Sequence, residues 1–125
     1  MRNLEQRKRW SLMIELTSAD LTCPITTAQK VLSGKWTLMI IFHLKDGPVR
    51  FNELLRRFDG LTHSSLTKQL RQLENFRIIH REVYNQVPPK VEYSLTDLGK
   101  KLYPTMNELT EWGSEYIDNC KGVAR

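Results

Sequence analysis

The sequence predicts a mainly helical domain with one small β-hairpin, which is an α+β fold. Apolar residues recur at helical spacing in several consecutive segments up to residue 75. Two segments of alternating apolar and polar residues, Ile79–Tyr84 and Val91–Leu95, then flank the turn sequence Asn85–Pro89, and this pattern indicates a hairpin. A long stripe of apolar residues follows to near the C-terminus. We therefore expect a group of helices, then a hairpin, then a long final helix.

The size and composition fit one cytoplasmic domain. The 125 residues are 40% hydrophobic and 26% charged, which is enough for one hydrophobic core. The longest apolar run, Leu38–Phe42, is far shorter than the ~20 residues that span a membrane. Trp10–Leu16 is too short for a signal peptide and lacks a small-residue cleavage site. The two cysteines lack a CxxC spacing, which favours a reducing compartment.

Two helices are expected before residue 46. Cys23 and Pro24 suit the start of the first helix, and Gly34 suits its end. The second helix covers Lys35–Lys45 and is apolar nearly all round, which predicts burial on most of its sides as the central helix of the core. Turn residues follow it, and Val49–Phe51 is long enough for a short extended stretch.

The next two segments predict a pair of short helices joined by a tight turn. The first has apolar residues at positions i, i+3, i+4 and i+7, namely Phe51, Leu54, Leu55 and Phe58. Thr62 is expected to cap a second helix that runs to about Asn75. Its buried stripe consists of Leu66, Leu70 and Leu73. This pair is typical of a helix-turn-helix, and the hairpin that follows completes the element order of a winged helix-turn-helix domain.

The final helix is expected to pair two subunits. Its apolar residues recur at spacings of three and four after a capping Thr96, and they are Leu98, Leu102, Met106, Leu109, Trp112 and Tyr116. Pro104 lies inside this stripe and is expected to bend the helix. A helix this long cannot bury all its apolar residues on its own domain, so we expect a homodimer. Residues 1–22 are expected to form a helical arm in the same interface, which leaves 23–95 as the winged helix-turn-helix and 96–125 as the dimerisation helix.

Positive charge favours a nucleic-acid partner. The net charge is +5, and the excess lies in the first three-quarters of the chain. Hydroxyl, amide and cationic side chains on the exposed face of the helix that starts after Thr62 are suited to base edges and phosphates in a major groove. These residues are His63, Ser64, Ser65, Thr67, Lys68, Arg71 and Gln72. Alone they would indicate a solvated polar face, but the hairpin that follows favours double-stranded DNA.

Further DNA contacts are expected from the hairpin and the segment before the helix pair. The candidates for phosphate or minor-groove contacts are Arg50, Arg81, Asn85, Gln86 and Lys90. Charged hairpin residues also simply prevent edge-to-edge aggregation, and that alternative stays open. For Arg56 and Arg57 a solvated charge is the slightly better interpretation.

Chemistry other than DNA binding has one candidate, the thiol of Cys23. A thiol at a helix N-terminus lies where backbone donors favour the thiolate, the form that oxidants and electrophiles attack. The alternative is a small buried hydrophobic residue. His43, His63 and His80 have no metal-ligand spacing, and His43 is expected to be a hydrogen-bonded core histidine. No phosphate-binding loop or nucleophile elbow is present, so we expect no enzyme, metal or cofactor.

The chain resembles the HxlR-type bacterial transcription regulators, which are related to MarR-type proteins, over about residues 23–113. The motifs that carry the resemblance are Cys23-Pro24, Gly34-Lys35-Trp36-Thr37-Leu38, Gly47-Pro48, Arg50-Phe51-Asn52-Glu53-Leu54, Leu66-Thr67, Leu70, Leu73-Glu74, Val87-Pro88-Pro89, Val91-Glu92-Tyr93-Ser94-Leu95-Thr96, Leu98-Gly99 and Trp112. The resemblance implies a dimeric repressor or activator that binds a palindromic operator, with the helix after Thr62 as the recognition helix. It also implies dimerisation through the N- and C-terminal helices. Several members of the family sense quinones, aldehydes or disulfide stress through the cysteine that matches Cys23.

Two alternatives to a thiol-switched DNA regulator remain. One is a winged-helix docking module for proteins, which would bind no duplex. The other is a regulator with a structural Cys23 that responds to a small ligand bound between the dimer helices. Salt-sensitive DNA binding that needs Lys68 or Arg71 distinguishes a DNA regulator from a docking module.

Overall fold

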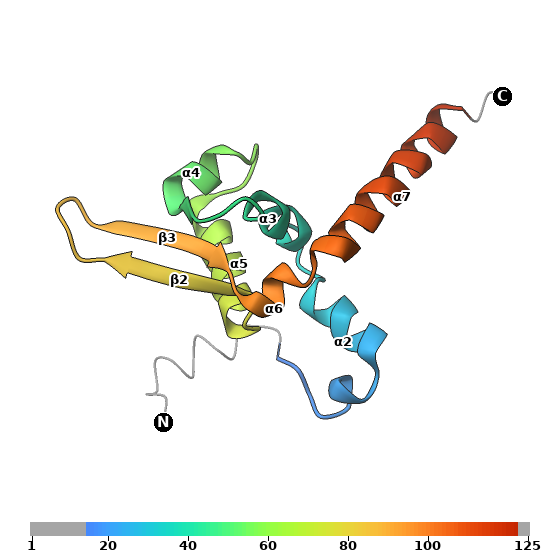
Figure 1. Cartoon of the computed structure of the whole chain (residues 1–125), viewed down its shortest axis with the longest axis horizontal. Coiled ribbons are helices and arrows are strands. Elements are labelled where there is room, and N and C mark those ends of the chain that lie inside the picture. The colour runs from blue at the N-terminus through green and yellow to red at the C-terminus, as the bar shows by residue number, and fades with distance from the viewer. Residues whose placement is uncertain (1–14, 123–125) are drawn as a thin grey trace.

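The computed structural model describes residues 15–122, with a helical body from which a hairpin projects on one side and a long helix on another (Figure 1). The elements are η1 (Asp20–Thr22), α2 (Pro24–Val31), α3 (Thr37–His43), β1 (Val49–Arg50), α4 (Phe51–Arg56), α5 (His63–Asn75), β2 (Ile79–Tyr84), β3 (Lys90–Leu95), α6 (Asp97–Lys100) and α7 (Tyr103–Lys121). The predicted α+β class is confirmed. Residues 1–14 of the expected arm lie outside the described residues. No helix in the described range is long and apolar enough to cross a membrane.

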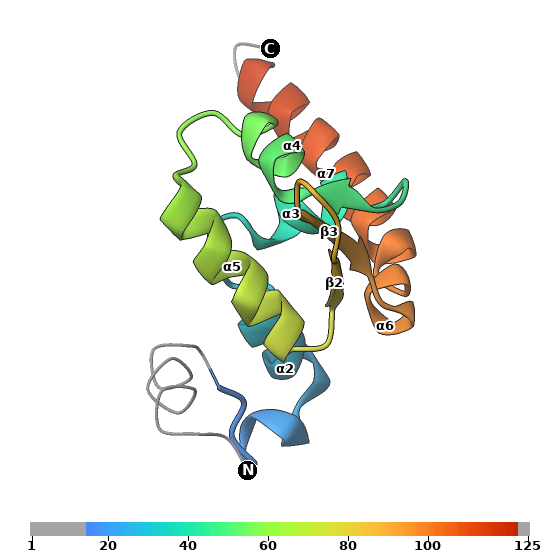
Figure 2. The same cartoon turned by 90° about the vertical axis from the view of Figure 1, so that its left-hand side faces the viewer.

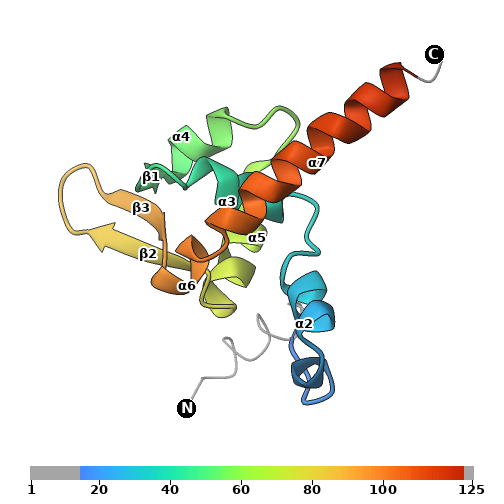
Figure 3. The ribbon, with the colours of Figure 1, turned by 45° about the vertical axis from the view of Figure 1, so that its right-hand side comes forward.

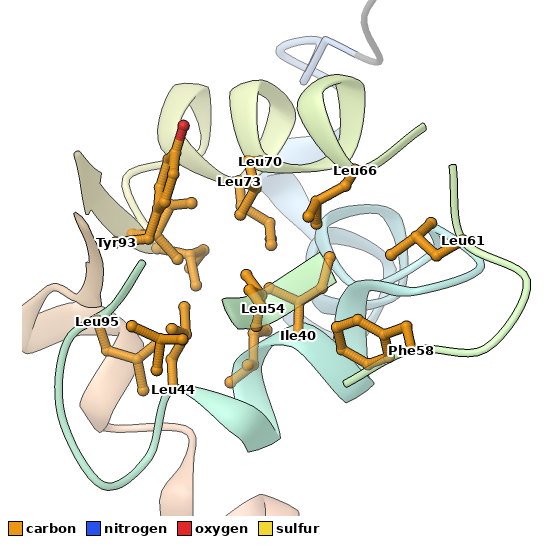
Figure 4. Packing of buried hydrophobic residues seen from close by; sticks show 14 of the residues in the cluster. Ile40, Leu44, Leu54, Phe58, Leu61, Leu66, Leu70, Leu73, Tyr93 and Leu95 are labelled. Carbon is orange, nitrogen blue, oxygen red and sulfur yellow. The ribbon is translucent and has the colours of Figure 1, made fainter. Parts of the chain in front are cut away.

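The core lies where α3, α4 and α5 meet the sheet (Figure 4). The stripe expected on α5 is buried, with Leu66 at 0% exposure and Leu70 and Leu73 at 1%. Leu54 of α4 and Ile40 of α3 are at 0% on the facing helices. Burial of such large aliphatic side chains is the main force that holds the helix pair in place, at about 1.5–3 kcal/mol for each.

The central helix α3 is buried on one side only, so the expectation of burial on most sides is wrong for this chain. Ile40 and Ile41 are fully buried, whereas Leu38, Met39 and Phe42 are 37%, 48% and 39% exposed. His43 is half-buried and packs edge-on against Phe58, with ring centroids 4.9 Å apart. Its pKa is lowered, first by burial and then by nearby positive charge. The exposed side of α3 is therefore apolar.

The predicted hairpin is part of a three-stranded antiparallel sheet in the order β1-β3-β2. β2 and β3 pair with Ile79 opposite Leu95 and Tyr84 opposite Lys90. The short extended stretch expected at Val49 forms β1 and pairs with Tyr93 of β3 (Figure 3). A two-residue strand is too short to give a periodic pattern, so its partner could not be identified from the sequence.

The expected single bent helix after Thr96 is in fact two helices, which corrects the prediction for Pro104. The Thr96 hydroxyl accepts a hydrogen bond from the Gly99 N–H at 3.0 Å and caps the short α6. Pro104 lies in the first turn of α7, where its missing N–H leaves no bond unmade. α6 thus turns the chain between the sheet and α7, and Pro104 starts a helix instead of bending one.

Substitution of Gly99 by Ala is expected to destabilise the domain by about 1–3 kcal/mol, the usual cost of overpacking. A Cβ on this buried glycine would lie 2.2 Å from the Ile78 carbonyl oxygen, and the backbone there cannot move aside like a flexible side chain. Thermal unfolding measures the effect, with Lys100→Ala on the exposed side of the same helix as the control. Equal melting temperatures for Gly99→Ala and the wild type would contradict the close contact.

Candidate nucleic-acid interface

The exposed face of α5 is built by a capped N-terminus and a buried opposite side. The Thr62 hydroxyl accepts a hydrogen bond from the Ser65 N–H at 3.1 Å, which fixes the first turn. The hydroxyl of Thr67 donates to the His63 carbonyl oxygen at 2.9 Å, and Thr62 donates to the Ser65 hydroxyl at 2.9 Å. Thr67 and Ser65 are therefore partly occupied by local hydrogen bonds. Ser64, Lys68 and Arg71 are exposed, as expected for side chains that face a ligand.

Gln72 is the exception among the residues expected on this face. It is only 6% exposed and lies on the buried side of α5 beside Leu73. The buried side of α5 is wider than its leucine stripe. It also includes Gln69, whose side-chain oxygen accepts a hydrogen bond from the Thr37 hydroxyl of α3 at 3.3 Å. The prediction that Gln72 points to the ligand is wrong, and we leave it out of the interface.

Residues of the helix pair, β1 and the hairpin line an open groove. Figure 2 shows the arrangement of the helices α4 and α5 and the strands β2 and β3 that contribute to it. Its lining includes residues of β1, α4, α5, β2 and β3. The cationic side chains that line it are Arg50, Arg56, Arg57, Arg71, Arg81 and Lys90. The acidic ones are Glu53, Glu74 and Glu92. The groove thus gathers most of the cations that the sequence analysis singled out, from elements far apart in the chain.

Ion pairs within the groove divide these cations into two groups. Glu53 pairs with Arg56, and it lies 3.5 Å from Nε of Arg57. Arg57 also donates to the His43 carbonyl oxygen at 3.2 Å, so its role includes joining α4 to the end of α3. Lys90 Nζ lies 2.7 Å from a Glu92 carboxylate oxygen. Within residues 15–122, the structure gives no ion pair to the remaining groove cations, Arg50, Arg71 and Arg81.

The hairpin presents two different surfaces. Arg81 is opposite Tyr93 in the register, and both line the groove. On the other side of the hairpin, Glu82 is opposite Glu92, and His80 lies 2.7 Å from the Glu82 carboxylate. Asn85 and Gln86 are exposed at the tip, as expected. Glu92 lines the groove as well and is paired with Lys90, so within the described residues Arg81 is the hairpin cation of the groove that has no acidic partner.

The start of α5 is fixed to the groove by aromatic contacts. The ring of His63 lies 4.6 Å from that of Phe51, and Phe51 lies 6.4 Å from the ring of Tyr93. Tyr93 is buried, Phe51 is half-buried and His63 is exposed. These contacts place His63, at the first position of α5, on the wall of the groove.

Some of the residues expected to pair two subunits are buried in the core of the chain, and the others are exposed on its surface. Met106 is 9% exposed and Leu102 packs against the core cluster, so these two anchor α7 to its own domain. Leu98 is exposed but belongs to α6. Leu109, Trp112 and Tyr116 are 42%, 62% and 58% exposed on α7. The last two rings stack at 5.3 Å with an interplanar angle of 26°, which leaves an uncovered apolar stripe on the projecting part of the helix.

Cys23 takes the expected place at the N-terminus of α2 and is half-exposed. Hydrogen bonds from the Thr26 hydroxyl, and then from the Thr26 backbone, lower the pKa of its thiol. The preceding segment is held on α2 by an ion pair between Asp20 and Lys30 at 2.7 Å. Thr27 adds a hydrogen bond from its hydroxyl to the Asp20 carbonyl oxygen. The other thiol, Cys120, is exposed near the end of α7.

A helix pair with a polar, cationic second helix, followed by a hairpin that lines the same groove, defines a winged helix-turn-helix protein. The family model described as the HxlR-like helix-turn-helix matches residues 31–121. The chain belongs to this family of transcriptional regulators.

Curated relatives and solved structures agree with this assignment. The chain is 46% identical to the HTH-type transcriptional regulator YdeP of Bacillus subtilis over 108 residues, which cover 86% of this chain and 84% of YdeP. The reduced form of the redox regulator HypR has a TM-score of 0.75 at 45% identity, covering 80% of this chain and 99% of HypR. The oxidised form has a TM-score of 0.70 at 48% identity, covering 74% and 96%.

Proposed function

We propose that the protein is a transcriptional regulator that binds a palindromic operator in double-stranded DNA as a homodimer. The observation that carries the proposal is the exposed α5 face with Lys68 and Arg71, next to a groove that holds Arg50 and Arg81 without acidic partners in the described residues. Side chains of these types read guanine edges and bind phosphates. Such a regulator acts in the cytoplasm on the chromosome, and it supplies no catalysis.

The second subunit is proposed to cover the apolar stripe of α7. Leu109, Trp112 and Tyr116 form this stripe, and aromatic residues are enriched in such interfaces. The exposed side of α3, with Leu38 and Phe42, is a second apolar surface that a partner copy can cover. A twofold pair places two α5 helices in successive major grooves about 34 Å apart, which corresponds to a palindromic operator.

The direct test is a titration of the purified protein on duplex DNA from its own upstream region, at several salt concentrations. A DNA regulator is expected to shift this duplex, and the logarithm of its affinity should fall linearly with the logarithm of the salt concentration. A docking module for proteins would bind no duplex. Footprinting on the same DNA gives the operator sequence. Expression measurements from this DNA give the sign of regulation and test candidate inducers.

We further propose that Cys23 is a thiol switch for this DNA binding. A thiol at the start of α2 with a lowered pKa and a half-exposed position can react with an oxidant or an electrophile. Two of the structural neighbours are forms of a redox regulator, which supports a reaction of this kind. The alternative is a structural Cys23 in a regulator that responds to a small ligand.

Treatment with diamide is expected to lower the operator affinity of the wild type at least about tenfold, a typical size for coupling between two sites. The variant Cys23→Ser should bind the operator like the reduced wild type and should not respond to diamide. Diamide joins two thiols in one disulfide and is itself reduced to the hydrazine, so the second thiol in this proposal is Cys23 of the other subunit. Cys120→Ser serves as the matched control and should keep the response. A wild type that binds equally well before and after oxidation would leave Cys23 as a structural residue.

A further inference from the structure

The side chain of Thr96 joins the end of α5 to the start of α6. Its hydroxyl donates to the Arg77 carbonyl oxygen at 2.7 Å and lies 3.1 Å from the Ile78 carbonyl oxygen. The hydroxyl oxygen also accepts the hydrogen bond from the Gly99 N–H that caps α6. The Thr96 N–H donates to the Ile78 carbonyl oxygen at 3.0 Å. These contacts of Thr96 with Arg77, Ile78 and Gly99 form a joint between two segments that are far apart in the chain.

The two carbonyl groups that Thr96 contacts belong to the residues that end α5. The Arg77 N–H donates to the Glu74 carbonyl oxygen and the Ile78 N–H donates to that of Leu73, both at 3.0 Å. This pair of hydrogen bonds is a Schellman motif, in which the residue after the helix is left-handed. Arg77 has this conformation, with φ at 63°. A residue other than glycine keeps it only where the surroundings hold the backbone, and the hydrogen bond from Thr96 contributes to this.

The other side of the joint leads directly into α7. Gly99 packs so closely on the Ile78 carbonyl oxygen that a Cβ there would lie 2.2 Å away. The Leu102 N–H donates to the Gly99 carbonyl oxygen at 3.1 Å, and the Met106 N–H donates to that of Leu102 at 2.8 Å. α6 thus connects the base of the hairpin to the start of α7 (Figure 1). The end of α5 and the start of α7 are therefore held in one relative orientation by contacts that meet at Thr96.

We propose that Thr96 is a positioning residue that fixes the angle between α5 and α7 and thereby selects the spacing of the operator half-sites. This inference rests on the proposed function, in which α7 pairs the two subunits and α5 enters the major groove. Thr96 is half-buried and is not among the residues that line the groove. Its effect on DNA recognition is therefore indirect, through the orientation of α5.

The length of α5 converts a small change at the joint into a large one at the DNA. The helix has 13 residues, or about 20 Å, and the joint holds its C-terminal end. A tilt of about 10° there would move His63 at the other end by about 3.5 Å, close to the rise of one base pair. The apolar stripe of α5 opposes such a tilt less sharply, because hydrophobic contacts are non-directional whereas hydrogen bonds depend on angle.

The first test measures operator affinity while the spacing of the half-sites is changed. Fluorescence-anisotropy titrations use the footprinted operator and two versions with one base pair inserted or removed at the centre. The wild type is expected to bind the natural spacing at least about 10-fold more tightly than either altered spacing. Thr96→Val has the same branched shape without the hydroxyl and should lower this preference to about 3-fold or less. Thr96→Ser keeps the hydroxyl and should keep the wild-type preference.

The second test measures the orientation of the two helices and needs no DNA. Spin labels on Ser64→Cys in α5 and Ser114→Cys in α7, both at exposed positions, report the distance between these helices. Cys23 and Cys120 are replaced by Ser, and an excess of unlabelled protein ensures that each measured pair lies within one subunit. The wild type should give one narrow distribution of distances. Thr96→Val should give a distribution that is broader or shifted by about 3 Å.

Arg77→Gly is a second variant that loosens the same joint, and it decides both tests if Thr96→Val does not fold. Glycine adopts a positive φ without strain, so this variant should fold, and its freer turn should broaden the distance distribution. A purely structural Thr96 would lower the melting temperature and leave the spacing preference and the distances unchanged. That result would overturn the role of Thr96 while the regulator stands. A wild type that binds no duplex would overturn the proposed function as well.

Discussion

Replacement of both Lys68 and Arg71 by Ala is expected to lower operator affinity by at least about 30-fold. The two side chains are exposed on α5, opposite the buried leucines. A well-placed contact of such a side chain to a base is worth about 1–3 kcal/mol, so two contacts give about 2–6 kcal/mol. Anisotropy titrations at a fixed salt concentration measure this loss.

The single variants separate base contacts from phosphate contacts. A residue that contacts a phosphate should weaken binding to all sequences and reduce the salt slope, whereas one that reads a base should mainly relax specificity at one position. Lys100→Ala removes an exposed cation on α6, away from the groove, and serves as the control. A double variant that keeps wild-type affinity while Lys100→Ala weakens binding would place the interface elsewhere.

Substitution of Trp112 by Glu is expected to convert the dimer to monomers at micromolar concentration. Trp112 is 62% exposed in one subunit and stacks on Tyr116, so the proposed partner copy must cover it. Burial of a carboxylate without a cation costs several kcal/mol, and a twofold interface contains the substitution twice. Sedimentation velocity measures the mass directly. Loss of the dimer should also abolish tight binding to a two-half-site operator.

The matched control introduces the same charge on the other side of the helix. Ser114 is exposed on α7 and lies about 200° around the helix from Trp112, so Ser114→Glu should leave the dimer intact. Circular dichroism should show equal helix content for both variants. A dimeric Trp112→Glu protein would show that the stripe on α7 is not the interface.

Much of the fold could be predicted because the signals were local. Thr62 with its leucine stripe identified α5, and the turn sequence between two alternating segments identified the hairpin. The break before α7 was missed because its apolar spacing continues through Leu102. Periodicity reports which residues share a side of a helix, but it does not report whether the backbone hydrogen bonds are continuous. Pro104 was the available signal, and proline fits the start of a helix better than its interior.

The candidate site was predicted less completely, because it depends on contacts between distant elements. Gln72 has the residue type of a DNA contact, and its burial follows only from the packing of neighbouring helices. Two candidate phosphate contacts are engaged in ion pairs, Lys90 with Glu92 and Arg56 with Glu53. The sequence lists these cations but does not show which carboxylates lie beside them.

The anchoring of α7 has a mechanical consequence for two joined copies. Leu102, Tyr103 and Met106 fix its beginning to the domain, and the Tyr103 hydroxyl donates to the Lys45 carbonyl oxygen at the end of α3. The rest of α7 projects from the body (Figure 3). It therefore acts as a rigid spacer, with about 1.5 Å of length for each residue. If the α7 helices of two copies shifted by one helical turn relative to each other, the two α5 helices would move by about 5 Å. This is more than the roughly 3.4 Å between neighbouring base pairs.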